Sequence, residues 1–229
     1  MGDRICRVLD LGRLEYAEAE RLQERLVEAR RAGEVPDTLL LVEHEPVVTL
    51  GSGSSDAGEG LKPKLINSAG VEVRRVSRGG RATFHGPGQL VGYPILDLRH
   101  HLQDLHWYLR SLEQVLIDAL AQVGCNAERK DGLTGVWIRD RKVASIGIAV
   151  RGWITWHGFA LNLDCDRQWW RLLDPCGLSA GRMASLTELC TQAPSREAVA
   201  ESVVQRFGEV FRLNVVESDR TELFRASTF

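Results

Sequence analysis

The alternation of hydrophobic and polar positions divides the chain into many short strands and a few long helices. Strands are expected over residues 6–11, 38–42, 47–50, 71–76, 82–84, 90–98, 135–139, 142–150, 154–163 and 213–216. Helices are expected over residues 14–31, 105–123 and 195–211. Asp104 and Gly124 suit the two ends of the second of these helices. Strands joined by turn-sized links, together with long helices, indicate an α+β fold with a large mixed or antiparallel sheet.

One stretch without hydrophobic periodicity interrupts this pattern. Residues 51–60, GSGSSDAGEG, have almost no apolar content and predict a mobile surface loop, placed over an opening in the fold. The stretch is not a phosphate-binding Walker loop, because no Lys-Ser/Thr pair follows its glycines.

Composition narrows the class of protein. The 229 residues, 44% hydrophobic with a formal net charge of −2, are typical of a globular chain, and one domain over residues 1–229 is expected. The N-terminus lacks a signal-peptide pattern and no apolar run is long enough for a membrane span, so a cytoplasmic protein is expected. Its five cysteines are odd in number and widely scattered, which argues against a disulfide framework and against a zinc ligand pair. Most of them are expected to be core residues.

The first candidate binding stretch is RGGRATFHGPGQLVGYP, residues 78–94. Glycine at this density permits close backbone approach to a ligand and exposes N–H groups that bind carbonyl or phosphate oxygens. A set of bulges and turns at a sheet edge explains the glycines equally well. His85, within the stretch, is either a structural residue or a general base or donor to an acyl oxygen.

The second candidate stretch covers residues 142–162. Lys142 is one of only four lysines against 25 arginines, and it opens a strongly apolar strand. A solvated strand edge is the alternative explanation for a lysine in this position. Ser145, Gly147 and Gly158 place small residues along the same region, where a substrate chain has room to lie.

The third candidate is Cys176. It stands between Pro175, which fixes φ, and Gly177, which tolerates almost any backbone conformation. Neither a continuous helix nor a central strand is expected to pass through it. No other cysteine of the chain is flanked in this way, and a function for this thiol requires a partner elsewhere in the chain.

Together these stretches resemble the octanoyltransferase family of lipoate biosynthesis, the lipoyl(octanoyl) transferases. The likeness runs from about residue 39 to about residue 190, and it includes LLLVEHEPVVTLG at residues 39–51. Ala184 departs from it, standing where many relatives have threonine. The matching residues are Arg78–Gly80, Thr83–Leu90, Lys142–Gly147, His157–Asn162 and Pro175–Gly177.

The resemblance implies a biotin/lipoate protein ligase-like fold, sandwich-like, with a large mixed sheet flanked by helices. It also implies a two-step acyl transfer by a Cys176/Lys142 dyad. Octanoate would pass from acyl carrier protein to Cys176, and then to a lysine amine of the lipoyl domains of 2-oxoacid dehydrogenases or of the glycine cleavage H protein. No cofactor is expected, neither ATP nor a metal, because thioester exchange is nearly balanced and amide formation from a thioester is favourable.

The resemblance further assigns an acyl pocket. Its residues are Arg78, Gly79, Gly80, Arg81, Ala82, Thr83, Phe84, His85, Ser145, Ile146, Gly147, His157, Gly158, Phe159 and Ala160. Arg74, Arg75, Arg78 and Arg81 form a local positive cluster. This cluster is either a docking face for acidic carrier domains or a solvated strand face.

Two other functions stay open at this level. An ATP-dependent lipoate or biotin protein ligase of the same fold needs a lysine but no nucleophilic cysteine, so Cys176 argues against it. A non-catalytic module could bind nucleic acid or phosphate through the arginine-glycine stretch. The pI near 6.3 and the lack of aromatic residues among those arginines argue against that module, and no nucleic-acid partner is expected.

Overall fold

The structure is a computed structural model, and it describes residues 4–55, 60–173 and 182–220. Its large sheet contains β1 (Ile5–Leu14), β2 (Asp37–His44), β6 (Gln89–Ile95), β7 (Glu128–Lys130), β8 (Leu133–Ile138), β9 (Arg141–Arg151), β10 (Ile154–Asn162) and β11 (Asn214–Glu217). The spatial order is β11-β1-β2-β6-β10-β9-β8-β7, with β1 parallel to β2 and β11 and the remaining neighbours antiparallel. The sheet is therefore mixed, as the sequence predicts.

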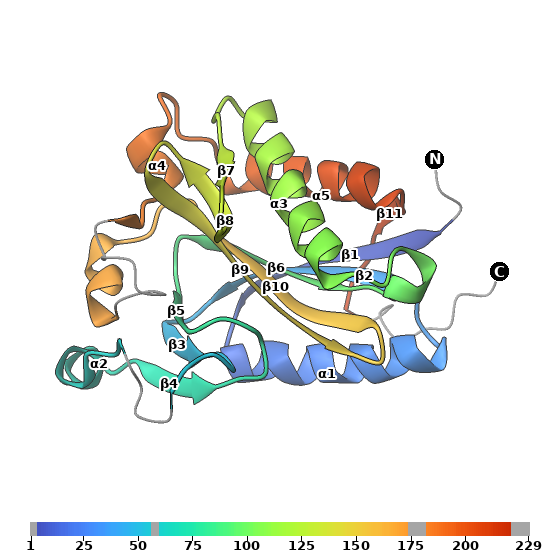
Figure 1. Cartoon of the computed structure of the whole chain (residues 1–229), viewed down its shortest axis with the longest axis horizontal. Coiled ribbons are helices and arrows are strands. Elements are labelled where there is room, and N and C mark those ends of the chain that lie inside the picture. The colour runs from blue at the N-terminus through green and yellow to red at the C-terminus, as the bar shows by residue number, and fades with distance from the viewer. Residues whose placement is uncertain (1–3, 56–59, 174–181, 221–229) are drawn as a thin grey trace.

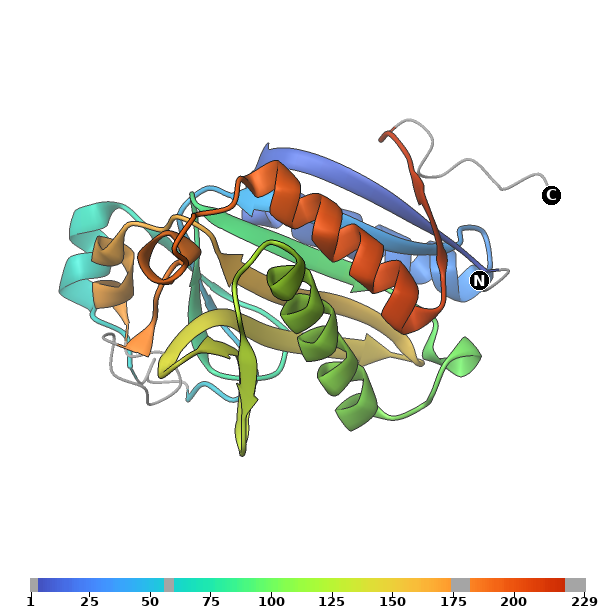
Figure 2. The same cartoon turned by 90° about the horizontal axis from the view of Figure 1, so that it is seen from above.

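Helices cover both faces of this sheet. They are α1 (Tyr16–Ala32), α3 (Leu105–Gln122) and α5 (Arg196–Phe211). The helix α1 lies on one face, while α3 and α5 pack against each other on the opposite face (Figure 1, Figure 2). Leu26 belongs to the hydrophobic cluster on the α1 side, and Leu112 and Phe207 belong to the larger cluster on the α3 side. Each helix buries one apolar stripe against the sheet, as its sequence spacing requires.

A second, smaller unit packs at one end of the sheet (Figure 1). It consists of a three-stranded sheet in the order β4-β3-β5 and two short helices. Its core contains Val48, Phe84, Trp170 and Met183. The elements are β3 (Val47–Leu50), β4 (Glu72–Arg75), β5 (Ala82–His85), α2 (Pro63–Ala69) and the 3₁₀ helix η2 (Arg167–Leu172). The short helix α4 (Leu186–Leu189) follows along the chain and packs in the larger cluster on the α3 side. The large mixed sheet expected from the sequence is therefore confirmed, and β3, β4 and β5 form a second sheet beside it.

The three long helices are confirmed within about two residues at their ends. Asp104 caps α3 as expected, since its carboxylate accepts the backbone N–H groups of His106 and Trp107. The expected strand 90–98 ends early, and the 3₁₀ helix η1 (Leu98–His100) follows it. The sequence patterns did not indicate α2, α4, β7 or η2, which are too short to show a period.

The cysteines correct one expectation. Cys125, after α3, and Cys190, at the end of α4, form a disulfide with a Cα–Cα distance of 5.5 Å. Cys6 and Cys165 are buried free thiols, as expected for core residues. Scattered spacing therefore did not exclude a disulfide, because the fold brings distant positions together. No helix in the described part of the chain is both long and apolar enough to cross a membrane.

Candidate active site

Small residues on two neighbouring strands form the floor of a cavity. In the antiparallel pair of β9 and β10, Gly147 lies opposite Gly158 and Ser145 lies opposite Ala160. Side chains alternate between the two faces of a strand, and Ala160 packs in the cluster beneath α1. The small residues therefore leave a hollow on the α1 side of the sheet.

The loop of residues 78–81 forms the roof. Gly79 N–H donates to the Ile148 carbonyl at 2.8 Å, which fixes the loop to β9. The Arg78 guanidinium donates to the carbonyls of Gly79, Arg81 and Thr49 and to the Thr49 hydroxyl. A Cβ on Gly147 would lie 3.0 Å from both the Arg78 Cδ and the Gly79 oxygen. Glycine at position 147 therefore lets the roof approach the floor closely.

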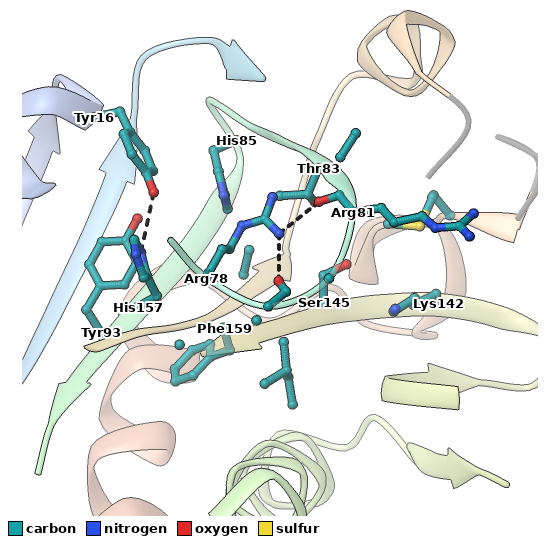
Figure 3. A pocket seen from close by; sticks show the side chains of 18 residues that line it. Tyr16, Arg78, Arg81, Thr83, His85, Tyr93, Lys142, Ser145, His157 and Phe159 are labelled. Atoms are coloured by element: carbon teal, nitrogen blue, oxygen red, sulfur yellow. Dashed lines mark hydrogen bonds between the residues drawn. The ribbon is translucent and has the colours of Figure 1, made fainter. Parts of the chain in front are cut away.

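Lys142 lies at one end of the cavity (Figure 3). It is 8% exposed, and its Nζ lies 5.7 Å from the centre of the Trp137 ring. The lysine stem packs on Gly135, where a Cβ would lie 2.5 Å from the Lys142 Cε. The buried carboxylate of Glu113 on α3 accepts the Gly135 N–H at 3.0 Å. A helix and a glycine of the neighbouring strand thus support the position of the lysine.

Aromatic side chains from three other elements close the opposite end. Tyr16, Tyr93 and His157 gather there, and His85 lies beside them rather than beside Lys142 (Figure 3). The hydroxyl of Tyr16 is 3.5 Å from His157 Nδ1, and Ser77 Oγ is 3.2 Å from His157 Nε2. This placement gives no support to His85 as a donor to an acyl oxygen near Lys142.

His44 lies behind this end of the cavity. Its Nδ1 is 2.9 Å from the Leu14 carbonyl, which can only accept, so Nδ1 carries the proton. Nε2 therefore accepts the hydroxyl proton of Tyr93 at 2.7 Å. This pair of hydrogen bonds requires a neutral His44 and holds the Tyr93 ring in place.

The aromatic end of the cavity is kept neutral by burial. Burial lowers the pKa of His44 to about 4 and, aided by the Arg78 charge, the pKa of His157 to about 3. Burial also lowers the pKa of His85 and raises the pKa values of Tyr16 and Tyr93. These imidazoles and phenols are therefore uncharged near neutral pH. The end of a bound hydrocarbon chain would contact neutral rings there.

The structure gathers almost all of the expected acyl-pocket residues. Of the fifteen, every residue except Phe84 lines this cavity together with Lys142. The Phe84 ring instead stacks on Trp169, with ring centres 5.1 Å apart, in the core of the smaller sheet. The expectation that Phe84 lines the pocket is wrong, because its ring fills the core of the smaller sheet, while Ala82, Thr83 and His85 of the same strand line the cavity.

The expected nucleophile, Cys176, lies outside the described residues. The two ends of its segment are described. Leu173 forms a bridge with Leu61, and Met183 forms a bridge with Lys142. Ala184 N–H donates to the Lys142 carbonyl, and Met183 lines the cavity beside that lysine. The chain therefore returns directly to Lys142 after the segment that contains the cysteine.

Three residues of the cavity were absent from the expected set. They are Tyr16, Tyr93 and Met183. Tyr93 stands in the glycine-rich stretch GQLVGYP, which is a usable signal for a residue close to a ligand. Tyr16 and Met183 carry no such signal, since each is an ordinary apolar position of its own element.

The arginine cluster is divided between different roles. Arg78 is 6% exposed and holds the roof, and Arg74 pairs with Glu72 and Glu20, whereas Arg75 and Arg81 are exposed. The docking hypothesis, which concerns the exposed members of the cluster, therefore applies to Arg75 and Arg81 and stays a prediction.

The glycine-rich loop is also more ordered at its start than a mobile surface loop. Ser52 and Gly53 donate hydrogen bonds to the carbonyls of Arg78 and Gly80. Residues 56–59 lie outside the described residues.

Comparison with known proteins places these observations in context. Residues 15–208 match the family described as Lipoyl protein ligase A/B catalytic domain. A Gloeobacter violaceus protein named octanoyltransferase is 48% identical over 207 residues, covering 90% of each chain. An octanoyltransferase of Synechococcus elongatus is 46% identical over 216 residues, covering 94% of this chain and 91% of its own.

Solved structures share the fold at much lower identity. A bipartite lipoate protein ligase from Thermoplasma acidophilum has a TM-score of 0.78 at 18% identity, over 96% of this chain and 89% of its own. Lipoate-protein ligase A bound with ATP has a TM-score of 0.74 at 16% identity, over 97% and 91%. These likenesses confirm the ligase-like fold expected from the sequence.

Proposed function

The chain belongs to the octanoyltransferases of the lipoyl protein ligase A/B catalytic domain family and is an acyltransferase, and from this premise we propose its reaction. It transfers an octanoyl group from acyl carrier protein to Cys176, and from Cys176 to the lysine amine of a lipoyl domain. Lipoyl domains of 2-oxoacid dehydrogenases and the glycine cleavage H protein are the proposed acceptors.

One observation carries the proposal: a cavity with one buried lysine, Lys142, at one end and uncharged aromatic rings at the other. Burying the methylene and methyl groups of an octanoyl chain there contributes about 5 to 6 kcal/mol, at about 0.8 kcal/mol each. The segment that contains Cys176 ends at Met183, beside Lys142. The reacting carbonyl is therefore proposed to lie at the Lys142 end, with the hydrocarbon directed towards Tyr16 and Tyr93.

In the first step, the Cys176 thiolate attacks the carbonyl carbon of the octanoyl thioester. The new C–Sγ bond forms as the C–S bond to the pantetheine arm breaks, and the leaving thiolate takes a proton from the Lys142 ammonium. In the second step, the acceptor amine attacks the same carbonyl carbon. The C–N bond forms, the C–Sγ bond breaks, the amine proton passes to Lys142, and the cysteine returns as thiolate.

The buried environment of Lys142 suits this proton exchange. Burial of an ammonium disfavours its charged form, which brings a lysine closer to accepting and returning a proton at neutral pH. A cation close to the cysteine in turn favours its thiolate. The balance of bonds and protons in the two steps closes without ATP or a metal.

The proposal is tested by incubating the protein with octanoyl-acyl carrier protein and measuring intact mass. We expect one octanoyl adduct that hydroxylamine removes and that transfers to a lipoyl domain added later. Cys176→Ala should form no adduct, and an adduct that persists in this variant contradicts the proposal. Modification of the lipoyl domain from free octanoate only when ATP is present would instead assign the chain to ATP-dependent ligation.

A further inference from the structure

We call the cavity that contains Lys142, Ser145, Tyr16 and Tyr93 the acyl cavity. A second cavity lies next to it, on the other side of β9. Its volume is about 300 Å³, and we call it the α3 cavity. Residues of α3, β8 and β9 line it, namely Leu109, Leu133, Thr134, Trp137, Ile146 and Ile148. Ile146 and Ile148 pack towards the cluster under α3, whereas Ala149 packs towards the cluster under α1. The two cavities therefore lie on opposite faces of the same strand.

The two cavities share a wall, and Lys142 is part of it. Gly79, Gly80, Lys142, Ile146 and Gly147 line both. Lys142 stands at one end of this wall, and Gly79, whose N–H donates to the Ile148 carbonyl, stands at the other. The proposed reaction places the thioester carbonyl at the Lys142 end of the acyl cavity. A molecule that holds its acyl chain in the first cavity thus has the α3 cavity directly beside its reacting bond.

Resting on the proposed function, we propose that the α3 cavity binds the pantetheine arm of the acyl donor. The donor is a two-ended molecule, because its thioester joins a hydrocarbon chain to a long arm with two amides. The acyl cavity ends at Tyr16 and Tyr93 and accommodates only the hydrocarbon. The arm must leave from the Lys142 end, where the α3 cavity begins.

The walls of the α3 cavity match the chemistry of this arm. Leu109, Ile146 and Ile148 offer an apolar surface for its methylene and methyl groups. The Thr134 hydroxyl and the backbone of Gly79, Gly80 and Gly132 offer hydrogen-bonding groups for its amides. An acceptor lysine side chain is much shorter and has no amide within its length, so it makes less use of such a cavity.

Positive charge also gathers at the Lys142 end of the α3 cavity, because Trp137 is the strand partner of Lys142. Lys130 Nζ lies 5.5 Å and Arg182 Cζ lies 5.3 Å from the centre of the Trp137 ring, and that ring also lines the α3 cavity. Lys130 pairs with Asp140, whose side chain is 87% exposed. An ion pair so open to solvent is weak, and these cations lie beside the reacting end of the donor rather than at the far end of its arm.

The test uses two donors to distinguish binding of the arm from reaction at the thioester. Octanoyl-phosphopantetheine carries the full arm, and octanoyl-N-acetylcysteamine carries only the part next to sulfur. Leu109→Trp should fill the α3 cavity with little cost to the core, since Leu109 is only partly buried. We expect it to lower the second-order rate of Cys176 acylation about tenfold or more for the long donor and less than about twofold for the short one.

His106→Trp is the matched control, because His106 is exposed on the same helix and does not line the cavity. It should change neither rate by more than about twofold. Thr134→Trp, which fills the cavity from an exposed position on β8, should repeat the donor-dependent loss if Leu109→Trp folds poorly.

Equal losses for the two donors, or no loss for either, would overturn the arm site. If AMP but not pantetheine slows the acylation of the wild-type protein by the long donor, the cavity binds a nucleotide. The proposed arm site is then overturned as well. A wild-type protein that neither donor acylates contradicts the proposed function itself, and the arm site with it. Retained acylation by the short donor in the variants therefore separates failure of the inference from failure of the function.

Discussion

At the residue scale, Lys142 and Lys130 form a natural pair for comparison. Both ammonium groups lie near the Trp137 ring, at 5.7 and 5.5 Å from its centre. Only Lys142 lines the two cavities, while the Lys130 side chain is 22% exposed and pairs with Asp140. Both lysines thus place a charge near Trp137, but only Lys142 of the two borders the cavity where the proposed reaction occurs.

We predict that Lys142→Ala slows octanoyl transfer by about a hundredfold to ten-thousandfold, the usual contribution of a positioned acid or base. Lys130→Ala should retain the rate with the short N-acetylcysteamine donor within about threefold. Single-turnover transfer to a lipoyl domain, followed by intact mass, measures both. A near-normal rate in Lys142→Ala would show that this lysine only closes the cavity, and thermal unfolding checks that both variants remain folded.

Consecutive residues of a strand need not all line the same cavity, and β5 gives an example. Thr83, Phe84 and His85 follow one another in β5, and all three were expected in the pocket. Thr83 and His85 line it, and Phe84 lies in the other core. A motif in a sequence does not say which of its members line a cavity, because the packing of each side chain decides it.

At the element scale, the position of Lys142 depends on a contact between α3, β8 and β9. Glu113 of α3 fixes the Gly135 N–H of β8, and Gly135 lies against the Lys142 stem of β9. Gly135 has a φ of 125°, and a Cβ there would lie 2.5 Å from both the Lys142 Cε and the Ala144 oxygen. Gly124 also has a positive φ, 80°, but a Cβ there would meet nothing within 4 Å, and it lines neither cavity.

We predict that Gly135→Ala lowers kcat about tenfold or more with little change in KM, because it displaces the lysine but not the walls of the acyl cavity. Gly124→Ala shares the cost of a positive φ without the collision, so its kcat should stay within about twofold. Steady-state transfer below the unfolding temperature of both variants separates the two effects. Equal kinetics for the two would show that Gly135 supports only the strand.

The disulfide is a second feature that belongs to the elements rather than to the residues. Cys125 and Cys190 are 65 positions apart, and they meet because α3 and α4 end at the same place. Closing a loop of this length removes unfolded-state entropy worth about 4 kcal/mol in the chain-entropy model. Spacing along the chain cannot reveal such a pair, since only the packing of the two helix ends determines it.

At the scale of the whole molecule, the buried histidines make stability depend on pH. His44 and His157 are 0% and 1% exposed, with pKa values of about 4 and about 3 in the folded protein. In the unfolded chain each histidine titrates near 6.5. The unfolded state therefore binds more protons below that pH, and acid favours it. Asp37 and Asp97 have lowered pKa values, so their stabilising effect is lost only at lower pH.

We predict that the free energy of unfolding is nearly constant between pH 6.5 and about 8 and falls between pH 6.5 and 4. The slope should be about 1.4 kcal/mol per pH unit for each buried histidine. Denaturant unfolding at several pH values measures it. His44→Gln should lower the slope by the contribution of one buried histidine. His106→Gln, at an exposed position, should not change the slope. A flat profile down to pH 4.5 would contradict neutral burial of these rings.

The sequence by itself determined the long helices, most strands and the glycine-rich surfaces of the cavity. Those features follow from local rules: periodic burial, helix caps and the close approach that glycine permits. They also placed Lys142 at the start of β9, where the structure has it. Residue types and their spacing were sufficient because each of these features depends on neighbours along the chain.

Only the tertiary structure decided which distant residues meet. It separated β3, β4 and β5 into their own sheet, joined Cys125 to Cys190, and brought Tyr16 of α1 into the acyl cavity. It also placed a second cavity across β9 from the first. These contacts join residues far apart in sequence, and they arise from the packing of whole faces, which no local pattern encodes.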